Sequence, residues 1–412
     1  MSALNPKRTV AELKELRALT DDANGAQRVA WTDTWLRARE WFTSKLAGLP
    51  VERHYDAAGN HWVTLPGESP RALLLGGHLD SVPNGGWLDG CLGVLASLEI
   101  MRRFATQYNG RPPITIRLVD FADEEGARFG RSLLGSSAFA GTASIDADRK
   151  RLDKDGILLE DALRRCGVEI ENFPKATIEQ ENAAAYLELH IEQGPILESA
   201  ALPLAVVTGT KGVERHAITF HGQEAHSGST PMNARRDALA AAAKLALEIR
   251  PIARKHTDAV CTMGSVKTFP GIVTAVVGRC EATLDQRDLD ATVLAEMYQS
   301  ARSASERFAK EEGCTVEWSR IWNIEPIPFH PYLIELCEQA INETSGPPLH
   351  LPSGPLHDAA EVSRAGIPTV MMFVQSLKGI SHNKIEDTRE EHLVAAITAL
   401  DRLASKTAEW IA

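Results

Sequence analysis

Residues 73–98 read LLLGGHLDSVPNGGWLDGCLGVLASL, and this stretch decides the fold of the chain. The apolar run Ala72–Leu75 is short and ends at a pair of glycines, which is typical of a buried strand. His78 and Asp80 follow where that strand would end, and a polar, glycine-rich turn leads to Asp89. Beyond the turn, apolar residues recur at helical spacing. The order of strand, polar loop and helix predicts an α/β domain with its site at the carboxyl end of a strand.

Further strands end in polar clusters of the same kind. Apolar runs at 114–121, 183–190 and 368–374 predict strands, and each is followed by acidic residues or histidine. Open α/β sheets build their sites at the carboxyl ends of such strands. The residues with ligand or acid–base chemistry at these ends are His78, Asp80, Asp89, Glu124, Glu125, His190 and His382.

The pattern of the chain changes near Gly209. From there the sequence predicts, in order, a strand, a helix, two strands, a helix and a strand, at 212–220, 233–249, 259–269, 271–285, 291–311 and 315–321. That order is the βαββαβ arrangement of a ferredoxin-like α+β domain. We therefore expect a catalytic, metal-binding α/β domain with a mixed, largely parallel sheet at 1–211 and 328–412, and an inserted domain at 212–327.

Composition limits the classes of function. The 412 residues exceed the usual size of one hydrophobic core, which supports two domains. A formal net charge of −11, with lysine and arginine dispersed, argues against a nucleic-acid or membrane-surface binder. The six cysteines are scattered, with no C-x-x-C, and the N-terminus carries no apolar signal segment. These features favour reduced thiols and a cytoplasmic protein.

The polar clusters favour metal-dependent chemistry. Three imidazoles together with several carboxylates suit Zn²⁺, Mn²⁺, Co²⁺ or Ni²⁺ better than Mg²⁺ or Ca²⁺. One carboxylate shared between two ions would make a two-metal site that polarises a carbonyl and activates water. Adjacent side chains diverge at a strand end, so one of Glu124 and Glu125 can bind metal while the other takes a proton. A purely structural role for these polar residues is the alternative.

The chain resembles the dinuclear-metal amidohydrolases of the N-carbamoyl-L-amino-acid hydrolase group, whose relatives are allantoate amidohydrolase and β-ureidopropionase. These belong to the wider aminoacylase and carboxypeptidase-G-type metallopeptidases. The resemblance covers nearly the whole chain in order, and it rests on GGHLDSV, GGWLDG, DFADEEGARFG, GSSAFAG, ELHIEQGPILE, EAHSGSTPMNARRDAL and ISHNKIEDT. The sequence HIEQG at 190–194 favours the carbamoyl branch, because the peptidase relatives typically carry Asp or Glu in place of that histidine.

The resemblance implies a set of metal ligands. His78, Asp89 and His190 would hold one divalent ion. Asp89, Glu125 and His382 would hold the other, with Asp89 bridging the two.

It also implies catalytic roles for three residues. Glu124 would be the general base, and Asp80 would orient His78 from behind. His226 of the inserted domain would stabilise the oxyanion when the domains close.

Substrate contacts follow from the same resemblance. Gln193 would contact the carbamoyl end, and Arg287 would clamp the substrate carboxylate. Thr274 stands where relatives carry an asparagine beside that arginine, and Val277 replaces a proline. His357 lies in GPLHD, where relatives carry GAGHD. These differences bear on the substrate rather than on the chemistry.

The expected reaction is cleavage of the ureido C–N bond of an N-carbamoyl-L-amino acid, with two divalent ions as cofactors and a homodimer formed through the inserted domain. Alternative substrates are allantoate, N-carbamoyl-β-alanine or an N-acyl amino acid. A non-catalytic scaffold is a different class, and the intact ligand residues and Glu124 argue against it. A two-metal phosphoesterase would need additional lysine or arginine near the motifs, which are poor in both.

Overall fold

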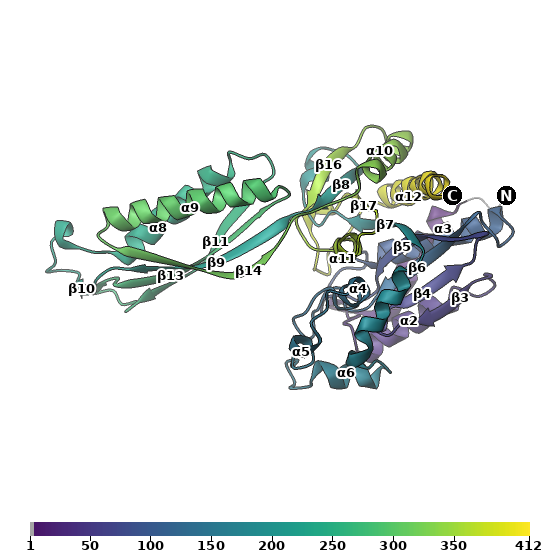
Figure 1. Cartoon of the computed structure of the whole chain (residues 1–412), viewed down its shortest axis with the longest axis horizontal. Helices are drawn as coiled ribbons and strands as arrows, with labels where there is room; N and C mark the ends of the chain where they lie inside the picture. The colour runs from purple at the N-terminus through teal and green to yellow at the C-terminus, as the bar shows by residue number, and fades with distance from the viewer. Residues whose placement is uncertain (1–3) are drawn as a thin grey trace. The chain divides into compact units, whose positions relative to one another are not determined.

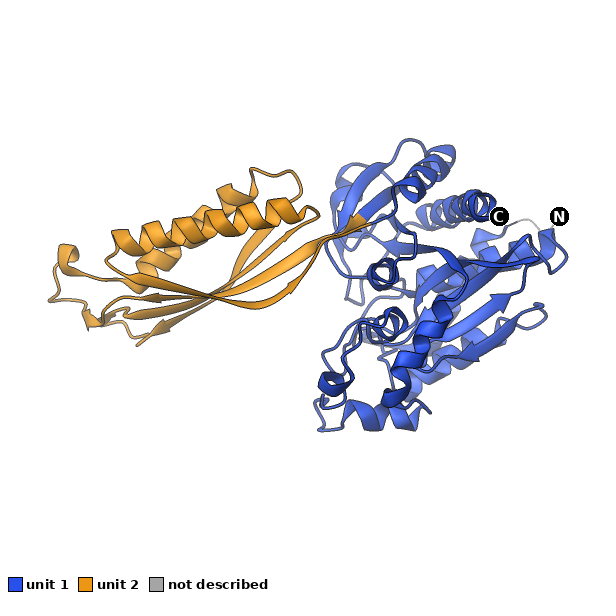
Figure 2. Ribbon diagram, in the orientation of Figure 1, with its two compact units in different colours: residues 1–208, 329–412 blue, residues 209–328 orange. Residues whose placement is uncertain are grey.

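The computed structural model describes residues 4–412. The chain forms two compact units, shown in different colours in Figure 2. The first unit consists of Met1–Thr208 and Phe329–Ala412, and the second consists of Gly209–Pro328. The second unit is therefore an insertion within the sequence of the first, and the chain passes between them twice.

The first unit contains a mixed sheet with the order β8-β17-β7-β5-β6-β4-β3, and β16 also pairs with β8. The four central strands, β17, β7, β5 and β6, run parallel, while β8, β4 and β3 are antiparallel to their neighbours. The bounds of these strands are β3 Glu52–Tyr55, β4 His61–Leu65, β5 Ser69–His78, β6 Ile114–Phe121, β7 Ala183–Ile191, β8 Leu204–Thr210, β16 Leu349–Ser353 and β17 Thr369–Val374.

Alternating residues of the central strands enter two different cores, one on each face of the sheet. Leu73 and Leu75 of β5 belong to a core that includes residues of α1, α2, α3, α10 and α12, whereas Leu74 belongs to a core with α4 and α11. These helices span Pro6–Thr20, Asp33–Ser44, Cys91–Gln107, Pro331–Ser345, Glu390–Ile411, Leu134–Ala140 and Asp358–Arg364, respectively. Figure 1 shows the labelled helices of this unit around the sheet. Helices on both faces make this a layered α/β unit, as the sequence predicts.

The carboxyl ends of the parallel strands lie at one edge of the sheet. β5 ends at His78, β7 carries His190 one residue before its end, and β6 ends three residues before Glu124. β17 ends at Val374, eight residues before His382. The topology therefore places the predicted ligand residues together at the carboxyl edge of the sheet.

The second unit is a four-stranded antiparallel sheet in the order β11-β13-β9-β14. Helices α8 and α9 pack on one face of it, where they share a core with Ile218, Phe220 and Leu284 of the strands. The elements span β9 Gly212–His221, α8 Ala238–Ala253, β11 Val260–Phe269, β13 Arg279–Asp288, α9 Ala291–Glu311 and β14 Thr315–Ile324. This order and pairing confirm the ferredoxin-like arrangement.

The strand predicted at 271–285 is wrong in its first part. β13 begins only at Arg279, and residues 270–278 form a loop in which Ile272 and Val273 are 58% and 97% exposed. Ile272 and Val273 are apolar but face no core, whereas Val276 is buried in the two-residue strand β12, Ala275–Val276. The helix predicted from residue 233 begins at Ala238, because the Asp237 carboxylate accepts the N–H groups of Leu239 and Ala240 and caps it.

Strands β8 and β16 were not predicted. The remaining elements are short or peripheral: β1 Asp21–Asp22, β2 Gly25–Ala26, α5 Ile145–Asp148, α6 Leu159–Arg165, α7 Ile196–Ser199, β10 Ala225–His226, β12 Ala275–Val276, β15 Ile327–Pro328, and 3₁₀ turns at Ile170–Gln180, Met232–Ala234 and Leu377–Gly379. Among the described residues, no helix has the length and apolar content required to cross a bilayer.

Candidate metal centre and active site

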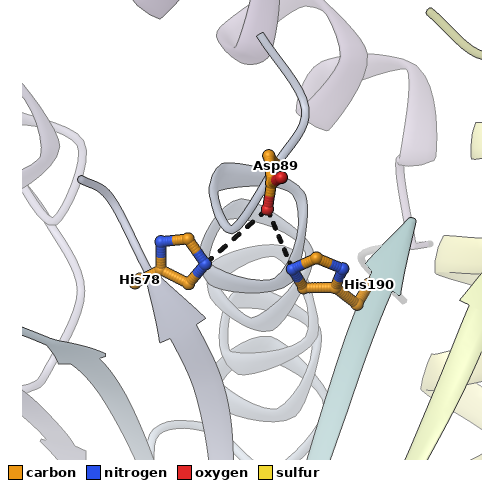
Figure 3. Close-up of side chains that lie close together, drawn as sticks. All are labelled: His78, Asp89 and His190. Carbon is orange, nitrogen blue, oxygen red and sulfur yellow. Dashed lines mark ion pairs between the residues drawn. The ribbon is translucent and has the colours of Figure 1, made fainter. Parts of the chain in front are cut away.

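Three buried side chains converge at the carboxyl edge of the sheet: His78, Asp89 and His190 (Figure 3). Nε2 of His190 lies 3.0 Å from Oδ1 of Asp89, and Nε2 of His78 lies 3.7 Å from the same oxygen. Ligand atoms that each lie about 2.1 Å from a tetrahedral ion are about 3.4 Å apart. The spacing of these three atoms therefore suits a single metal ion.

The other nitrogen of each imidazole fixes its tautomer. Nδ1 of His78 faces the carbonyl oxygen of Asp80 at 3.1 Å, and Nδ1 of His190 faces that of Ile191 at 2.9 Å. A carbonyl only accepts hydrogen bonds, so each Nδ1 carries the proton. Nε2 of both rings is buried and, within residues 4–412, forms no hydrogen bond. Two orphaned ring nitrogens beside one carboxylate are a donor set suited to a divalent cation.

The pKa values of the two histidines differ for a physical reason. Burial lowers the pKa of His78 to about 4, so this ring is neutral at pH 7. Burial also lowers the pKa of His190, but the adjacent Asp89 carboxylate outweighs it and raises the value to about 9. A proton and a metal ion would compete for the same lone pair of His190, so metal binding there would release a proton.

A second group of ligand atoms shares Asp89. Nε2 of His382 lies 3.4 Å from Oδ2 of Asp89 and 3.3 Å from Oε2 of Glu125. Oε1 of Glu125 is buried and forms no hydrogen bond within the described residues. Asp89 thus presents one oxygen to each group, which is the arrangement that a bridging carboxylate requires.

The site holds more carboxylates than the chain's own cations neutralise. Burial and neighbouring carboxylates raise the pKa of both Glu124 and Glu125 well above the usual range. Burial likewise raises the pKa of Asp80 to about 6. Buried carboxylates that repel one another are stabilised by a cation placed between them. The residues at this edge therefore fit divalent metal ions.

The Asp80 carboxylate supports the segment that carries the two glutamates. Its Oδ1 accepts the N–H of Glu124 and its Oδ2 accepts the N–H of Glu125, both at 3.2 Å. The same carboxylate lies 3.7 Å from Nδ1 of His78, so that ring is held mainly by the backbone carbonyl of Asp80. Oε2 of Glu124 reaches to within 3.7 Å of Nε2 of His78, beside the ligand atoms.

Backbone conformation at the site is restricted. Gly90, with φ of 66°, follows Asp89, and a Cβ at this position would lie 2.3 Å from the His78 ring. Asp123, Gln193 and His382 have φ of 60°, 57° and 53°, in the left-handed region that non-glycine residues seldom adopt. Such conformations persist where the surrounding structure fixes them, often at functional sites.

The structure brings Gln193 to the metal-ligand cluster. Its Nε2 donates to Oδ2 of Asp89 at 2.8 Å and to Oγ of Ser381 at 3.3 Å. His357 also lies close, with its ring centroid 4.3 Å from that of His190 and its Nε2 3.0 Å from Oγ of Ser353.

Sequence reasoning missed Glu386. This residue is 2% exposed, and its carboxylate accepts hydrogen bonds from the loop that carries Asp89. The only available signal was its place in the motif ISHNKIEDT, four residues after His382.

In the second unit, His226 lies on β10, which pairs with β12. Its Nδ1 accepts the N–H groups of Gly228 and Ser229 at 3.1 and 3.2 Å, so the proton of the neutral ring is on Nε2. The imidazole is exposed and can donate a hydrogen bond outward. Thr274 is adjacent, since its carbonyl accepts the N–H of Ser227.

Arg287 lies on β13 of the four-stranded sheet, near the end of that strand. Residue 279 pairs with residue 221 at the end close to β10, and Arg287 is eight residues further along β13, or about 26 Å at the usual strand rise. Its guanidinium forms an ion pair with Asp285, which Arg215 also contacts. Within one copy of this unit, His226 and Arg287 are therefore too far apart to contact one small substrate.

The residues of the cluster suit metal-assisted hydrolysis. Buried histidines and carboxylates that fit metal ions stand beside Glu124, a carboxylate suited to proton transfer. The fold and the site define a hydrolase of the α/β class with a candidate metal centre at the carboxyl edge of its sheet.

The chain belongs to peptidase family M20/M25/M40, whose model matches residues 74–406. It is 36% identical over 380 residues to an N-carbamoyl-L-amino acid amidohydrolase of Geobacillus stearothermophilus, covering 91% of each chain. It is 34% identical over 387 residues to an allantoate amidohydrolase of Escherichia coli, covering 92% of each. The resemblance found in the sequence is thereby confirmed.

Solved structures agree with this assignment. An amidase of the hydantoinase/carbamoylase family from Burkholderia phymatum has a TM-score of 0.89 and 32% identity, over 100% of this chain and 99% of that one. The corresponding amidase of Burkholderia multivorans has a TM-score of 0.88 and 31% identity, over 98% of both chains. The mixed α/β fold is confirmed along the whole chain.

Proposed function

We propose that this chain is a two-metal amidohydrolase that cleaves the carbamoyl group from an N-carbamoyl-L-amino acid. One water molecule is consumed, and the amino acid, CO₂ and ammonia are released. The observation that carries the proposal is Asp89, whose two oxygens each face a separate group of ligand atoms beside Glu124. Relatives named for carbamoyl and allantoate substrates, each matched over nine tenths of its length, support this reaction.

We assign His78, Asp89 and His190 to one ion and Asp89, Glu125 and His382 to the other. Imidazole and carboxylate ligands suit Zn²⁺, Mn²⁺, Co²⁺ or Ni²⁺. When bound, such ions polarise the carbamoyl carbonyl and lower the pKa of the attacking water.

Glu124 acts as the general base. It takes a proton from the attacking water and delivers it to the leaving nitrogen, so that one group serves as base and then as acid. Asp80 positions Glu124 by accepting its backbone N–H.

Arg287 and Gln193 contact the substrate. The planar guanidinium of Arg287 pairs with the α-carboxylate, although it must share its charge with Asp285. The Gln193 amide, already at the metal-ligand cluster, contacts the carbamoyl end. Thr274 provides a hydroxyl where relatives carry an amide, so anchoring of the α-carboxylate is weaker here.

A homodimer accounts for the distance between His226 and Arg287. A carbamoyl amino acid is far shorter than the roughly 26 Å along β13, so the two residues reach one substrate only if they come from different copies. In this arrangement the exposed Nε2–H of His226 from the partner copy stabilises the oxyanion. We place this dimer in the cytoplasm, in keeping with the scattered cysteines.

One assay tests the function. Metal-reconstituted protein is incubated with matched N-carbamoyl, ureido and N-acyl substrates, and both ammonia and free amino acid are measured. Release of amino acid and ammonia in equal amounts from N-carbamoyl-L-amino acids supports the proposal. Preference for allantoate would favour the second candidate, which the Escherichia coli relative and the change at Thr274 support. Failure to cleave any of the panel would contradict both.

A further inference from the structure

The Glu386 carboxylate joins two segments that are far apart in the sequence. Its Oε1 accepts the backbone N–H groups of Leu88 and Asp89, each at 3.1 Å. These bonds fix the direction in which the Asp89 side chain leaves the backbone. Glu386 itself lies four residues after His382, in a loop that begins about 300 positions later in the chain.

A second connection runs through the Ser381 side chain. Oγ of Ser381 lies 2.9 Å from Oε2 of Glu386 and 2.9 Å from Oδ2 of Asp89. Oδ2 is the oxygen that faces His382. The loop with His382 and the loop with Asp89 are therefore held together at both the backbone and the side chain of Asp89.

Gly86 provides the space for this carboxylate. A Cβ added there would lie 2.0 Å from both Cδ and Oε1 of Glu386. Glycine at this position is required by close approach rather than by an unusual φ. The chain thus keeps a site open for Glu386 beside the loop that carries Asp89.

We infer that Glu386 is a positioning residue that sets the spacing between Asp89 and His382 for the second metal ion. This role rests on the proposed two-metal function. Oε1 of Glu386 already accepts two backbone N–H groups, and Oε2 lies 2.9 Å from the Ser381 hydroxyl, so the residue acts through Asp89 and His382 rather than as a ligand. Groups that hold metal ligands in this way typically contribute about 10–100-fold to metal affinity.

The test measures metal binding directly. Chelator-treated full-length chain is titrated calorimetrically with Zn²⁺ and separately with Mn²⁺, for the wild type, Glu386→Ala, Glu386→Gln and Gly86→Ala. We expect Glu386→Ala to weaken one of two equivalents by about 10–100-fold and to regain activity at raised metal concentration. Glu386→Gln keeps an acceptor oxygen for the two N–H groups, so its loss should be below about tenfold.

Gly86→Ala displaces the carboxylate without removing it, and it should reproduce the weakened second equivalent. If Glu386→Ala does not fold, the metal affinity of Gly86→Ala tests the positioning role of Glu386 instead. Asp237→Ala is the matched control, because Asp237 also accepts two backbone N–H groups, those of Leu239 and Ala240, but lies in the second unit, which carries none of the assigned metal ligands. It should leave both metal affinities unchanged.

Failure of the Glu386 role and failure of the two-metal function give different titrations. If the wild type binds two equivalents and both Glu386→Ala and Gly86→Ala retain them at wild-type affinity, the positioning role of Glu386 is wrong. If the wild type binds fewer than two equivalents, the two-metal function fails instead. The role of Glu386 is then judged on the ion held by Asp89, whose affinity Glu386→Ala must still lower.

Discussion

Nε2 of His190 lies 3.0 Å from Oδ1 of Asp89, while Nδ1 of the same ring faces a backbone carbonyl. Because that carbonyl accepts a hydrogen bond from Nδ1–H, Nε2 of a neutral His190 presents its lone pair to the Asp89 oxygen. Two lone pairs at this distance repel, so the arrangement favours either an added proton or a cation between them.

Removing metal should abolish activity and lower thermal stability. A chelator strips the ion from the His190 and Asp89 lone pairs, and any ligand bound only by the native state stabilises it, by about 2.7 kcal/mol at a concentration of 100 Kd. Ammonia release and the thermal midpoint should both return on adding Mn²⁺, Co²⁺, Ni²⁺ or Zn²⁺. Full turnover by protein shown to be metal-free would contradict the metal centre.

Asp89 should be the most sensitive ligand. Asp89→Ala removes an oxygen from each group of ligand atoms, so both metal equivalents should be lost. His382→Ala removes a ligand from only one group and should lose one equivalent. Metal content after dialysis, measured by elemental analysis, distinguishes these outcomes. Equal losses in the two variants would show that Asp89 does not bridge.

Glu124→Gln should separate binding from chemistry. The amide has nearly the same shape but cannot accept the water proton, so kcat should fall by about 10²–10⁴-fold while both metal equivalents remain. Metal content and kcat are measured on the same preparation. Loss of metal with an unchanged rate per bound ion would reverse the roles of Glu124 and Glu125.

Arg287→Ala should raise KM for substrates with an α-carboxylate. The resulting drop in kcat/KM should correspond to a loss of about 2–5 kcal/mol of transition-state stabilisation. The matched carboxamide substrate should be much less affected, because it carries no charge for the guanidinium to pair. Equal losses of kcat/KM on the carboxylate and carboxamide substrates would show that Arg287 does not recognise the substrate carboxylate.

Thr274→Asn should improve kcat/KM for ordinary N-carbamoyl-L-α-amino acids, because it restores the amide that relatives carry at this position.

The proposed dimer makes a prediction about mixed variants. His226→Ala and Glu124→Gln should each be nearly inactive alone. Subunits exchanged between them should form some dimers in which one site has both an intact Glu124 and an intact His226 from the other copy. Activity should therefore reappear on mixing. A wild-type monomer in solution scattering at micromolar concentration, or no recovery after demonstrated exchange, would count against the shared site.

The parts of the molecule predicted from sequence are those with local signals. The short apolar run Ala72–Leu75, which ends three residues before His78, predicts both the strand and the candidate ligand at its end. Ile272 and Val273 are apolar but exposed, so a local pattern misplaced the start of β13. Glu386 has no local signal beyond its place in ISHNKIEDT, because the N–H groups it accepts belong to residues 88 and 89, far away in the sequence. The separation of His226 from Arg287 depends on strand register, which only the folded sheet defines.

The place of β17 in the sheet bears on how the chain is made. β17 lies between β7 and β8, yet it is among the last strands to be synthesised, and His382 follows it. A ribosome adding about 5–20 residues per second needs tens of seconds to travel from His78 to His382. During that interval the nascent chain holds β7 without its partner β17 and has only part of its ligand set. Completion of the central sheet and of the candidate metal centre are therefore late and nearly simultaneous events in the synthesis of this chain.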